Sequence, residues 1–235
     1  MKKILSFVFL ITAISPFMGF AQAGKGEYLS NIKEELVKTW PNNRTINLVF
    51  HGHSVPSGYF RTPEIRTLES YPYQTLKALK EIYPTASVNV IVTAIGGENS
   101  EQGEKRFVDD VLTHKPDVLF IDYALNDRGI GLSRSEAAME KMIRAALERK
   151  IKVILLSPSP DLRVDITASG NELEKHACQL AQLAKKYDVG LADSYLAFKE
   201  LAKKGENLEE YMAQSNHPNE KGHQVIAGEL IQYFK

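Results

Sequence analysis

Short apolar runs alternate along this chain with stretches of helical periodicity. The runs, at 45–50, 87–94, 117–123, 152–156 and 189–192, lack strict polar alternation, which is typical of strands covered on both faces in a parallel sheet. Helical spacing predicts helices at 28–40, 71–82, 104–113, 135–149, 170–187, 195–203 and 219–234. With right-handed crossovers, this order predicts a three-layer α/β/α sandwich on a five-stranded parallel sheet.

The first 23 residues are predicted to be a signal peptide. Lys2 and Lys3 precede an apolar run over 4–20, and Ala21-Gln22-Ala23 follows as a small-x-small cleavage site. A proline and a glycine interrupt the run and no stop-transfer flank follows it, which favours cleavage over a retained anchor. We therefore expect export to the periplasm or the exterior, no membrane contact after cleavage, and one domain over residues 24–235.

The charge of the chain is balanced, with 29 lysines and arginines against 29 aspartates and glutamates. Nothing resembles the basic stripe that a phosphate backbone requires, which excludes nucleic acid as a partner. The single cysteine, Cys178, lies between apolar positions of a predicted helix, and we interpret it as a buried filler rather than a nucleophile. His114 and His176 also lie on predicted helices and are interpreted as ordinary surface residues.

Ligands of a doubly wound sheet bind beyond the carboxyl ends of its strands, so the residues that follow each strand are the candidates for chemistry. Ser54 follows the first strand in the turn Phe50-His51-Gly52-His53-Ser54-Val55-Pro56-Ser57-Gly58. A serine on a tight glycine-containing turn can expose its hydroxyl and direct its own backbone N–H at a bound carbonyl. An ordinary turn uses the same residue types, so this feature alone decides nothing.

Two further turns offer hydrogen-bond donors for a developing oxyanion. Gly96 and Gly97 follow the second strand, where paired glycines allow the backbone to approach a ligand closely. Asn126 follows the third strand, and its neutral amide donates without having a proton to lose. Near the C-terminus, His217 stands directly before Pro218, which favours an extended backbone that presents the ring to the sheet edge.

Taken in order, these features resemble the four sequence blocks of the SGNH, or GDSL, hydrolase family, which centre on Ser, Gly, Asn and His. The matching residues are Ser54, Gly97, Asn126 and His217, and the resemblance extends over 50–223. It implies a flavodoxin-like SGNH fold and a serine esterase. It also implies Ser54 as nucleophile, His217 as general base, an oxyanion hole made by Ser54, Gly97 and Asn126, and no cofactor.

The first and third blocks depart from the family pattern, with His53 in place of Asp and Ala124 in place of Gly. His53 is predicted to form a hydrogen bond within the nucleophile turn. His51 and His53, with His217, suggest a metal site as an alternative, but no further ligand has suitable spacing and no metal is expected. His223 is predicted to brace the loop that holds His217.

The most consequential departure is Gln214, which stands where family members commonly carry an aspartate three residues before the histidine. That aspartate fixes the imidazole tautomer, and replacing it by Asn in a comparable triad lowers turnover roughly 10⁴-fold. Three alternatives follow. A backbone or side-chain carbonyl, such as that of Gln214, orients His217; an acid such as Asp193 or Glu98 comes from another loop; or the chain is an inactive relative.

The resemblance and the predicted export favour hydrolysis of a short acyl ester, such as acetyl, on a carbohydrate. An acyltransferase with the same site and a non-catalytic carbohydrate-binding relative are the alternatives. The segment 59–64 after the nucleophile turn either walls the substrate cleft with aromatic side chains or is simply a packed loop.

Overall fold

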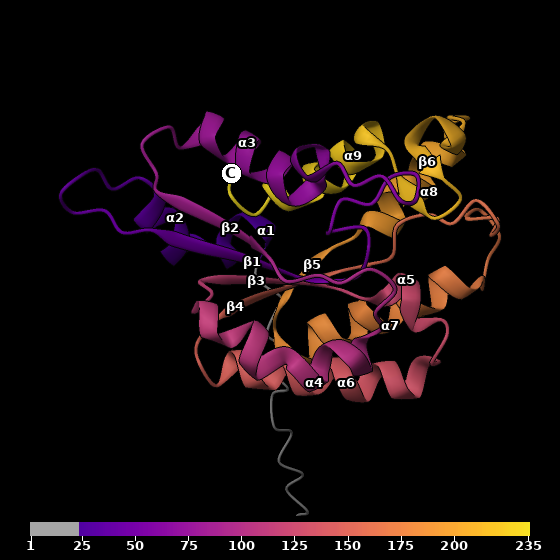
Figure 1. The fold of residues 1–235 in the computed structure, drawn as a ribbon, viewed down its shortest axis with the longest axis horizontal. Coiled ribbons are helices and arrows are strands. Elements are labelled where there is room, and N and C mark those ends of the chain that lie inside the picture. The colour runs from indigo at the N-terminus through magenta and orange to yellow at the C-terminus, as the bar shows by residue number, and fades with distance from the viewer. Residues whose placement is uncertain (1–23) are drawn as a thin grey trace, which may run out of the picture.

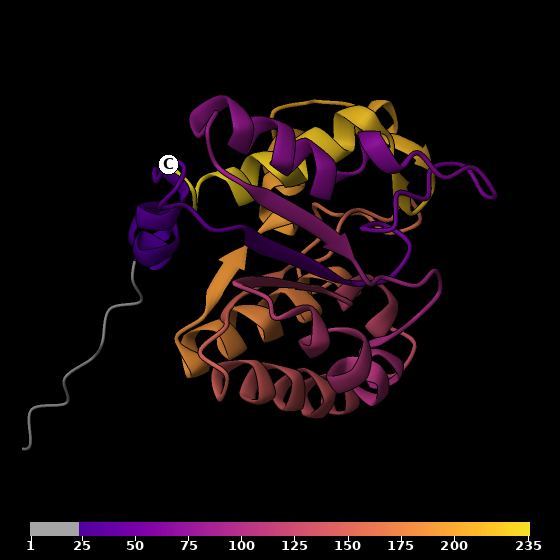
Figure 2. The same ribbon diagram turned by 60° about the vertical axis from the view of Figure 1, so that its left-hand side comes forward.

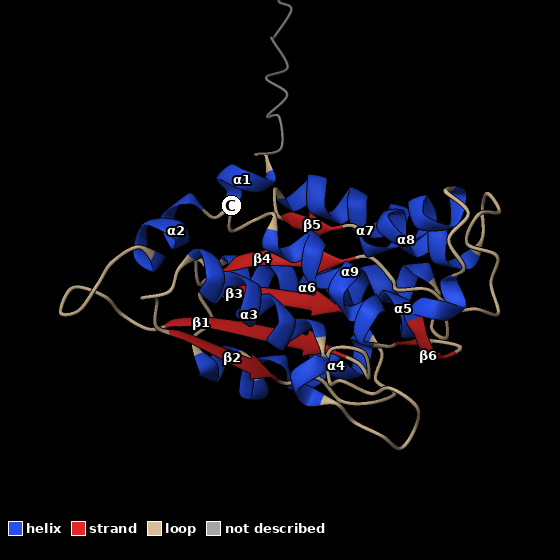
Figure 3. Ribbon diagram, turned by 90° about the horizontal axis from the view of Figure 1, so that it is seen from above, coloured by secondary structure: helices blue, strands red, loops and turns tan. Residues whose placement is uncertain are grey.

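The computed structural model describes residues 24–235, so the predicted signal peptide lies outside the described residues. A parallel sheet has the strand order β2-β1-β3-β4-β5. Its strands are β1 (Ile46–Gly52), β2 (Val88–Val92), β3 (Val118–Asp122), β4 (Lys152–Leu156) and β5 (Gly190–Ala192). Each pair of neighbouring strands runs parallel, so the carboxyl ends of the strands meet at one edge of the sheet, which Figure 3 shows from above. The predicted five-stranded parallel sheet with flavodoxin-like order is confirmed.

Helices cover both faces of the sheet, which gives the predicted three layers (Figures 1 and 2). One face carries α3 (Tyr71–Ile82), α8 (Ser194–Lys203) and α9 (Glu220–Ile231), and the short helices α1 (Lys25–Tyr28) and α2 (Ser30–Leu36) pack into the same core. The opposite face carries α4 (Ser100–Asp110), α6 (Leu132–Leu147) and α7 (Glu172–Tyr187). The 3₁₀ turns are η1 (Thr67–Glu69), η2 (Leu112–His114) and η3 (Leu208–Tyr211).

Successive residues of each strand enter different cores, because side chains of a strand alternate between its faces. In β1, Leu48 and Phe50 pack in the core under α3 and α9, whereas Val49 packs in the core over α4 and α6. All three side chains have no exposed surface. Burial of each stabilises the fold by roughly 1.5–3 kcal/mol, which explains why these runs are apolar without alternation.

Some element bounds differ from the sequence prediction. The helix predicted over 28–40 is two short helices that end at Leu36, and Trp40 lies in a loop with 84% of its surface exposed. Helical dihedral angles are unfavourable for Trp40 because Pro41 follows it. The helix predicted from 104 begins at Ser100, because Asn99 and Gln102 cap it reciprocally.

Two predictions for α7 were wrong. Cys178 is exposed, and His176 is buried with 4% of its surface accessible. The phase of the helix is the cause: the positions that face the sheet include Leu173, Ala177 and Leu180, and His176 falls on that face while Cys178 does not. His114, by contrast, is exposed as expected.

One helix and one pair of strands near the site were not predicted. A short helix, α5 (Ala124–Asp127), directly follows β3, and an antiparallel pair of short strands, β6 (Met212–Gln214) and β7 (His217–Pro218), precedes α9. Both lie beyond the carboxyl edge of the sheet, where Figure 3 shows α5 and β6. Within residues 24–235, no helix is long and apolar enough to cross a membrane.

Candidate active site

Ser54 lies in a rigid turn directly after β1. Its carbonyl accepts a hydrogen bond from the Tyr59 N–H at 3.1 Å, and the Ser57 hydroxyl donates to the carbonyls of His53 and Ala94 at 2.9 and 3.0 Å. These bonds close the turn on itself and tie it to the end of β2. The hydroxyl of Ser54 is therefore held at a fixed place beyond the sheet edge, with 6% of the residue exposed.

Gly52 allows β1 to lead into this turn. A Cβ on Gly52 would lie 2.4 Å from the carbonyl oxygen of Asp122 at the end of β3, and 2.9 Å from the ring of Pro56. Real side chains do not approach a backbone oxygen so closely. The glycine is therefore required by the close passage of β1 against β3, just ahead of Ser54.

A histidine ring lies next to this hydroxyl. His217 is in β7, and its Nε2 atom lies 2.9 Å from the Ser54 Oγ atom although 163 positions separate the two residues. The Nδ1 atom of His217 lies 2.9 Å from the carbonyl oxygen of Phe60. A carbonyl oxygen only accepts, so Nδ1 carries the proton and Nε2 is left to accept the serine O–H. This is the tautomer that a general base needs.

The environment of His217 keeps the ring neutral. Burial lowers the pKa of His217 below its ordinary value, and the hydrogen bond to the Phe60 carbonyl partly opposes this by favouring the charged form. The nearby His53 ring also lowers the pKa of His217. A neutral imidazole at neutral pH can accept the proton of the serine hydroxyl.

Gly97 and Asn126 were both predicted as oxyanion donors, and the Asn126 side chain contacts the residue next to Gly97. Gly97 has a φ of +81°, which favours glycine, and a Cβ there would meet no atom within 4 Å, so this turn faces open space. One amide N–H of Asn126 donates to the Glu98 carbonyl at 2.8 Å, which fixes the amide and leaves its second N–H available. Within the described residues, the backbone N–H groups of Ser54 and Gly97 donate to no other protein atom.

Comparison with known proteins agrees with this arrangement. The sequence profile of the GDSL-like lipase/acylhydrolase family matches residues 50–225, which includes every site residue discussed so far. The chain belongs to this family. Members of the GDSL family are carboxylic ester hydrolases, and this chain is one of them. A comparison with curated protein sequences finds no match.

Solved structures share the GDSL fold at low sequence identity. A mutant of the acetyl-xylooligosaccharide esterase Axe2 from Geobacillus stearothermophilus superposes with a TM-score of 0.70 at 19% identity, covering 80% of this chain and 94% of that one. A two-domain esterase active on acetylated mannans superposes with a TM-score of 0.72 at 20% identity, covering 88% of this chain and 52% of that one. Catalytic mutants of Axe2 replace a serine, a histidine and an aspartate.

Gln214, which stands at the position of the family's aspartate, forms no hydrogen bond with His217. The Gln214 side-chain oxygen accepts the Thr62 N–H at 3.0 Å, and its amide donates to Asn216. Of the three alternatives, the structure shows a carbonyl oxygen next to Nδ1 of His217, but this carbonyl belongs to the Phe60 backbone and not to Gln214. No sequence signal identifies Phe60, since every residue type carries the same backbone carbonyl.

The two acids that were considered as replacements are engaged elsewhere. Asp193 caps α8, accepting the Leu196 N–H at 3.1 Å and the Ser157 hydroxyl at 2.7 Å. The Glu98 carboxylate forms a bidentate pair with Arg106 at 2.8 and 2.5 Å and accepts the Tyr123 hydroxyl at 3.0 Å. Glu98 thus braces the loop that carries Gly97 and forms no hydrogen bond with His217.

Asp127, the second residue of the Asn-Asp pair, fixes the short helix that carries Asn126. Its carboxylate accepts the Ser100 N–H at 2.8 Å and the Ser135 hydroxyl at 2.6 Å, so α5 is tied to the first residues of both α4 and α6. Burial raises the pKa of Asp127, and its hydrogen bonds oppose that rise. These hydrogen bonds explain why a polar residue follows Asn126 in a buried place.

His53 lies beneath the nucleophile and forms the predicted hydrogen bond within the turn. Its Nδ1 atom accepts the Val55 N–H at 3.2 Å, and its Nε2 atom lies 3.3 Å from the Asp122 carboxylate. The same carboxylate accepts the Tyr71 hydroxyl at 3.0 Å. The histidine that replaces the family's aspartate therefore joins the nucleophile turn to β3 and α3.

His51 points into the opposite core and takes no part in a shared site with His217. Its nitrogens contact the Thr93 hydroxyl at 3.0 Å, the Gly103 carbonyl at 3.2 Å and the Tyr123 hydroxyl at 3.1 Å. Burial lowers the pKa of His51 to about 3. Among residues 24–235 there is no group of three or more His, Cys, Asp or Glu side chains placed to hold a metal ion.

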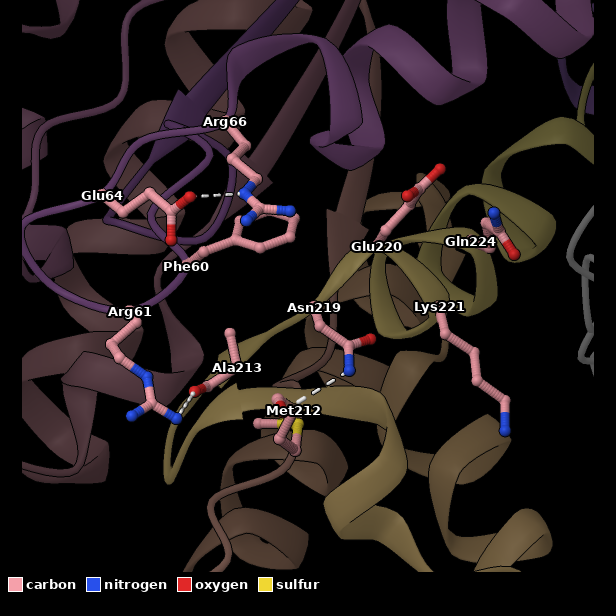
Figure 4. A pocket seen from close by; sticks show the side chains of 10 residues that line it. All are labelled: Phe60, Arg61, Glu64, Arg66, Met212, Ala213, Asn219, Glu220, Lys221 and Gln224. Atoms are coloured by element: carbon pink, nitrogen blue, oxygen red, sulfur yellow. Dashed lines mark hydrogen bonds and ion pairs between the residues drawn. The ribbon is translucent and has the colours of Figure 1, made fainter.

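Within the segment 59–64, Tyr59 lies beside the His217 ring and Phe60 packs in the interior. Tyr59 is half-buried with its ring centroid 6.0 Å from that of His217, whereas Phe60 is buried. A cavity of about 600 Å³ lies beside this segment, lined by Phe60, Arg66, Met212 and Lys221 among others (Figure 4). Neither Ser54 nor His217 lines that cavity, so it adjoins the reactive pair rather than containing it.

Proposed function

We propose that this GDSL hydrolase is an exported esterase that removes acetyl groups from carbohydrate by way of an acyl-enzyme on Ser54. The observation that carries the proposal is the 2.9 Å contact between Ser54 Oγ and His217 Nε2, in a ring whose Nδ1 proton is held by the Phe60 carbonyl. A hydroxyl in contact with a correctly oriented neutral imidazole is the arrangement of an activated nucleophile.

The proposed reaction has two steps. His217 takes the proton of Ser54 as Oγ attacks the ester carbonyl, and the resulting oxyanion is bound by the N–H groups of Ser54 and Gly97 with the Asn126 amide. His217 then protonates the leaving sugar oxygen as the C–O bond breaks, which leaves an acetyl ester on Ser54. Water attacks that ester with His217 again as base, and acetate departs as the Ser54 oxygen is reprotonated.

A small acyl group is supported by the surroundings of Ser54. The centroid of the Tyr59 ring lies 6.0 Å from that of the His217 ring, and a Cβ on Gly96 would lie 3.2 Å from the Tyr59 ring. An aromatic ring thus occupies the space between the base and the oxyanion loop, which restricts the room beside the nucleophile. Carbohydrate as the alcohol is supported by the fold shared with esterases described as active on acetylated xylo-oligosaccharides and mannans.

Acetate release from acetylated xylo- and manno-oligosaccharides tests this function, with Ser54→Ala as the negative control. We expect acetate from the wild-type protein and none above background from Ser54→Ala. Acetylation of an added sugar acceptor in place of acetate release would identify an acyltransferase. Binding of the oligosaccharide without turnover would identify a non-catalytic carbohydrate-binding protein, and either result would overturn the proposal.

Export is part of the proposal and rests on the sequence of the first 23 residues. Expression of the full chain in a bacterial host, followed by cell fractionation and N-terminal sequencing, tests it. We expect a processed protein that begins near Gly24 outside the cytoplasm. An unprocessed chain that stays in the cytoplasm would contradict this part of the proposal.

A further inference from the structure

The Phe60 carbonyl stands where a catalytic acid is expected, yet a backbone carbonyl is placed only as precisely as the residue that bears it. Phe60 lies outside the sheet, in the segment that links the nucleophile turn to α3. The Phe60 N–H donates to the Glu64 carbonyl at 3.0 Å, which closes the backbone of this segment locally. The Thr62 N–H also donates to the Gln214 side chain at 3.0 Å, which ties the segment to β6. The contacts of the Phe60 side chain add to this bond in setting the position of the Phe60 carbonyl relative to His217.

Two side chains hold the Phe60 ring. The His223 ring stacks on it with centroids 5.3 Å apart and an angle of 23° between the planes, and the Arg66 guanidinium carbon lies 5.2 Å from its centroid. His223 has no exposed surface, whereas the Arg66 side chain is 48% exposed. His223 therefore supports the ring from the interior and Arg66 covers it from the solvent side, as Figure 4 shows for Arg66.

His223 is itself fixed and neutral. Its Nδ1 atom accepts the Tyr71 N–H at the start of α3 at 3.2 Å, so the single proton of the neutral ring is on Nε2. Burial lowers the pKa of His223 to about 3, so the ring is uncharged at neutral pH. An uncharged ring here does not oppose the positive charge that His217 acquires during the reaction.

Arg66 is fixed from the other side. The Nε atom of its side chain donates to the Glu64 carboxylate at 2.7 Å. Its backbone N–H donates to the Gly58 carbonyl at 2.8 Å. A planar guanidinium can stack on an aromatic face while it pairs with a carboxylate, which an ammonium group cannot do in the same way. The segment thus folds its own arginine back over Phe60.

We propose that Arg66 and His223 are positioning residues of the reaction, which act by clamping the Phe60 ring so that its carbonyl orients His217 in place of an acid. The proposal rests on the function proposed above, since it presumes that His217 is the base. It assigns a role to two side chains that touch neither the nucleophile nor the base through a hydrogen bond.

Loss of this clamp, the contacts of Arg66 and His223 with the Phe60 ring, should change the orientation of His217 and not only the stability of the fold. Without it the Phe60 carbonyl loses its fixed place, and His217 then populates the tautomer with the proton on Nε2, which cannot accept from Ser54. We expect turnover to fall without a change in substrate binding, because the clamp acts on the orientation of the base. The signature is therefore a lower kcat at constant KM, together with a changed proton position on His217.

Arg66→Ala and Arg66→Lys test the solvent side, and Lys221→Ala is the matched control. Lys221 lines the same cavity and carries the same charge, but it pairs with Glu210 and lies over the Tyr211 ring. We expect Arg66→Ala to lower kcat by roughly 2- to 5-fold, the range of an exposed cation–π contact, with Arg66→Lys failing to restore it fully. Lys221→Ala should keep the wild-type kcat.

His223→Gln and His223→Phe test the interior side. Gln can still accept the Tyr71 N–H but has no ring, whereas Phe keeps the ring but has no acceptor. We expect a loss in kcat of roughly 10²-fold for His223→Gln, the scale of a misplaced reacting group, and a smaller loss for His223→Phe. If neither variant folds, as judged by circular dichroism, the Arg66 pair decides the question.

Long-range ¹H–¹⁵N NMR of the His217 ring gives a readout that does not depend on turnover. We expect the proton on Nδ1 in the wild-type protein and in Lys221→Ala, and a mixture of tautomers in folded Arg66→Ala and His223→Gln. Folded Arg66 and His223 variants with wild-type kcat and an unchanged His217 tautomer would overturn the clamp. A wild-type protein without esterase activity but with these NMR changes would overturn the proposed function and leave the clamp standing.

Discussion

At the scale of single residues, His217 and Asn126 each use one hydrogen-bonding group to contact the protein. Each side chain then has one further group left that can face a substrate. The Nδ1 proton of His217 is taken up by the Phe60 carbonyl, so its Nε2 atom is left for Ser54. One N–H of Asn126 donates to the Glu98 carbonyl, so its other N–H is left for the proposed oxyanion. Each side chain is oriented by one partner, which leaves one atom for its proposed role.

Asn126→Ala removes one of the three proposed oxyanion donors. We expect kcat for a small acetyl ester to fall by about 10² to 10³, because one such donor typically contributes that much. The protein should remain folded, since Asp127 rather than Asn126 ties α5 to α4 and α6. Steady-state kinetics beside Asn42→Ala, an exposed asparagine far from the site, measures the effect; equal rates for the two variants would remove Asn126 from the oxyanion hole.

The pH dependence of kcat/KM reports on the free base. Burial, the largest cause, lowers the pKa of His217 below 6.5, so the ring stays neutral and active into mildly acidic solution. We expect the acidic limb of the kcat/KM profile to have its midpoint below 6.5 and activity to be lost as pH falls through that midpoint. A midpoint above 6.5 would indicate a charge-stabilising acid near His217, contrary to this structure.

At the scale of elements, the strands are predictable because their burial on both faces leaves continuous apolar runs, and the helices because their periodicity follows from covering a sheet. No sequence pattern predicted α5, because a helix of four residues is too short to show a periodicity. No pattern predicted the role of the Phe60 carbonyl either, because a backbone carbonyl is chemically the same for every residue type. Cys178 was misplaced because neighbouring apolar residues suggested burial, while the phase of α7 turns it outward.

Two glycines predict opposite effects on stability. Gly52→Ala would place a Cβ 2.4 Å from the Asp122 carbonyl oxygen, so we expect destabilisation of about 3 kcal/mol or more from overpacking between β1 and β3. Gly228→Ala, inside α9 with no atom within 4 Å of its Cβ, should stabilise by about 0.5–1 kcal/mol. Urea unfolding measures both; a Gly52→Ala protein as stable as the wild type would show that β1 does not pass β3 this closely.

At the scale of the whole molecule, the parallel sheet gathers residues from distant parts of the chain at one edge. Ser54, Gly97 and Asn126 each follow a strand of the sheet, and the return of the chain through β6 and β7 brings His217 next to Ser54. Figure 3 shows β6 beyond this edge of the sheet. The family resemblance gave the identity of these residues, and the parallel topology explains why they meet. The replacement of the acid was beyond prediction, because it depends on how a loop folds back on the site.

The buried histidines predict how the molecule responds to acid. His51 and His223 have pKa values of about 3 in the folded protein because of burial, against about 6.5 when unfolded. Below 6.5 the unfolded chain therefore binds more protons, and each lower pH unit reduces stability by about 1.4 kcal/mol for each of these two groups down to their folded pKa. Circular dichroism with urea at pH 7 and 4.5 should show a loss on the order of 5 kcal/mol; unchanged stability would mean that these rings are not buried as described.

The central claim is that Ser54 is a nucleophile activated by His217. Mass spectrometry of the protein after exposure to a fluorophosphonate, with peptide mapping of the adduct, tests it most directly. The account predicts one adduct, on Ser54, and loss of that adduct in folded His217→Gln. An unmodified wild-type protein, or an adduct that forms on Ser54 equally fast without His217, would contradict it.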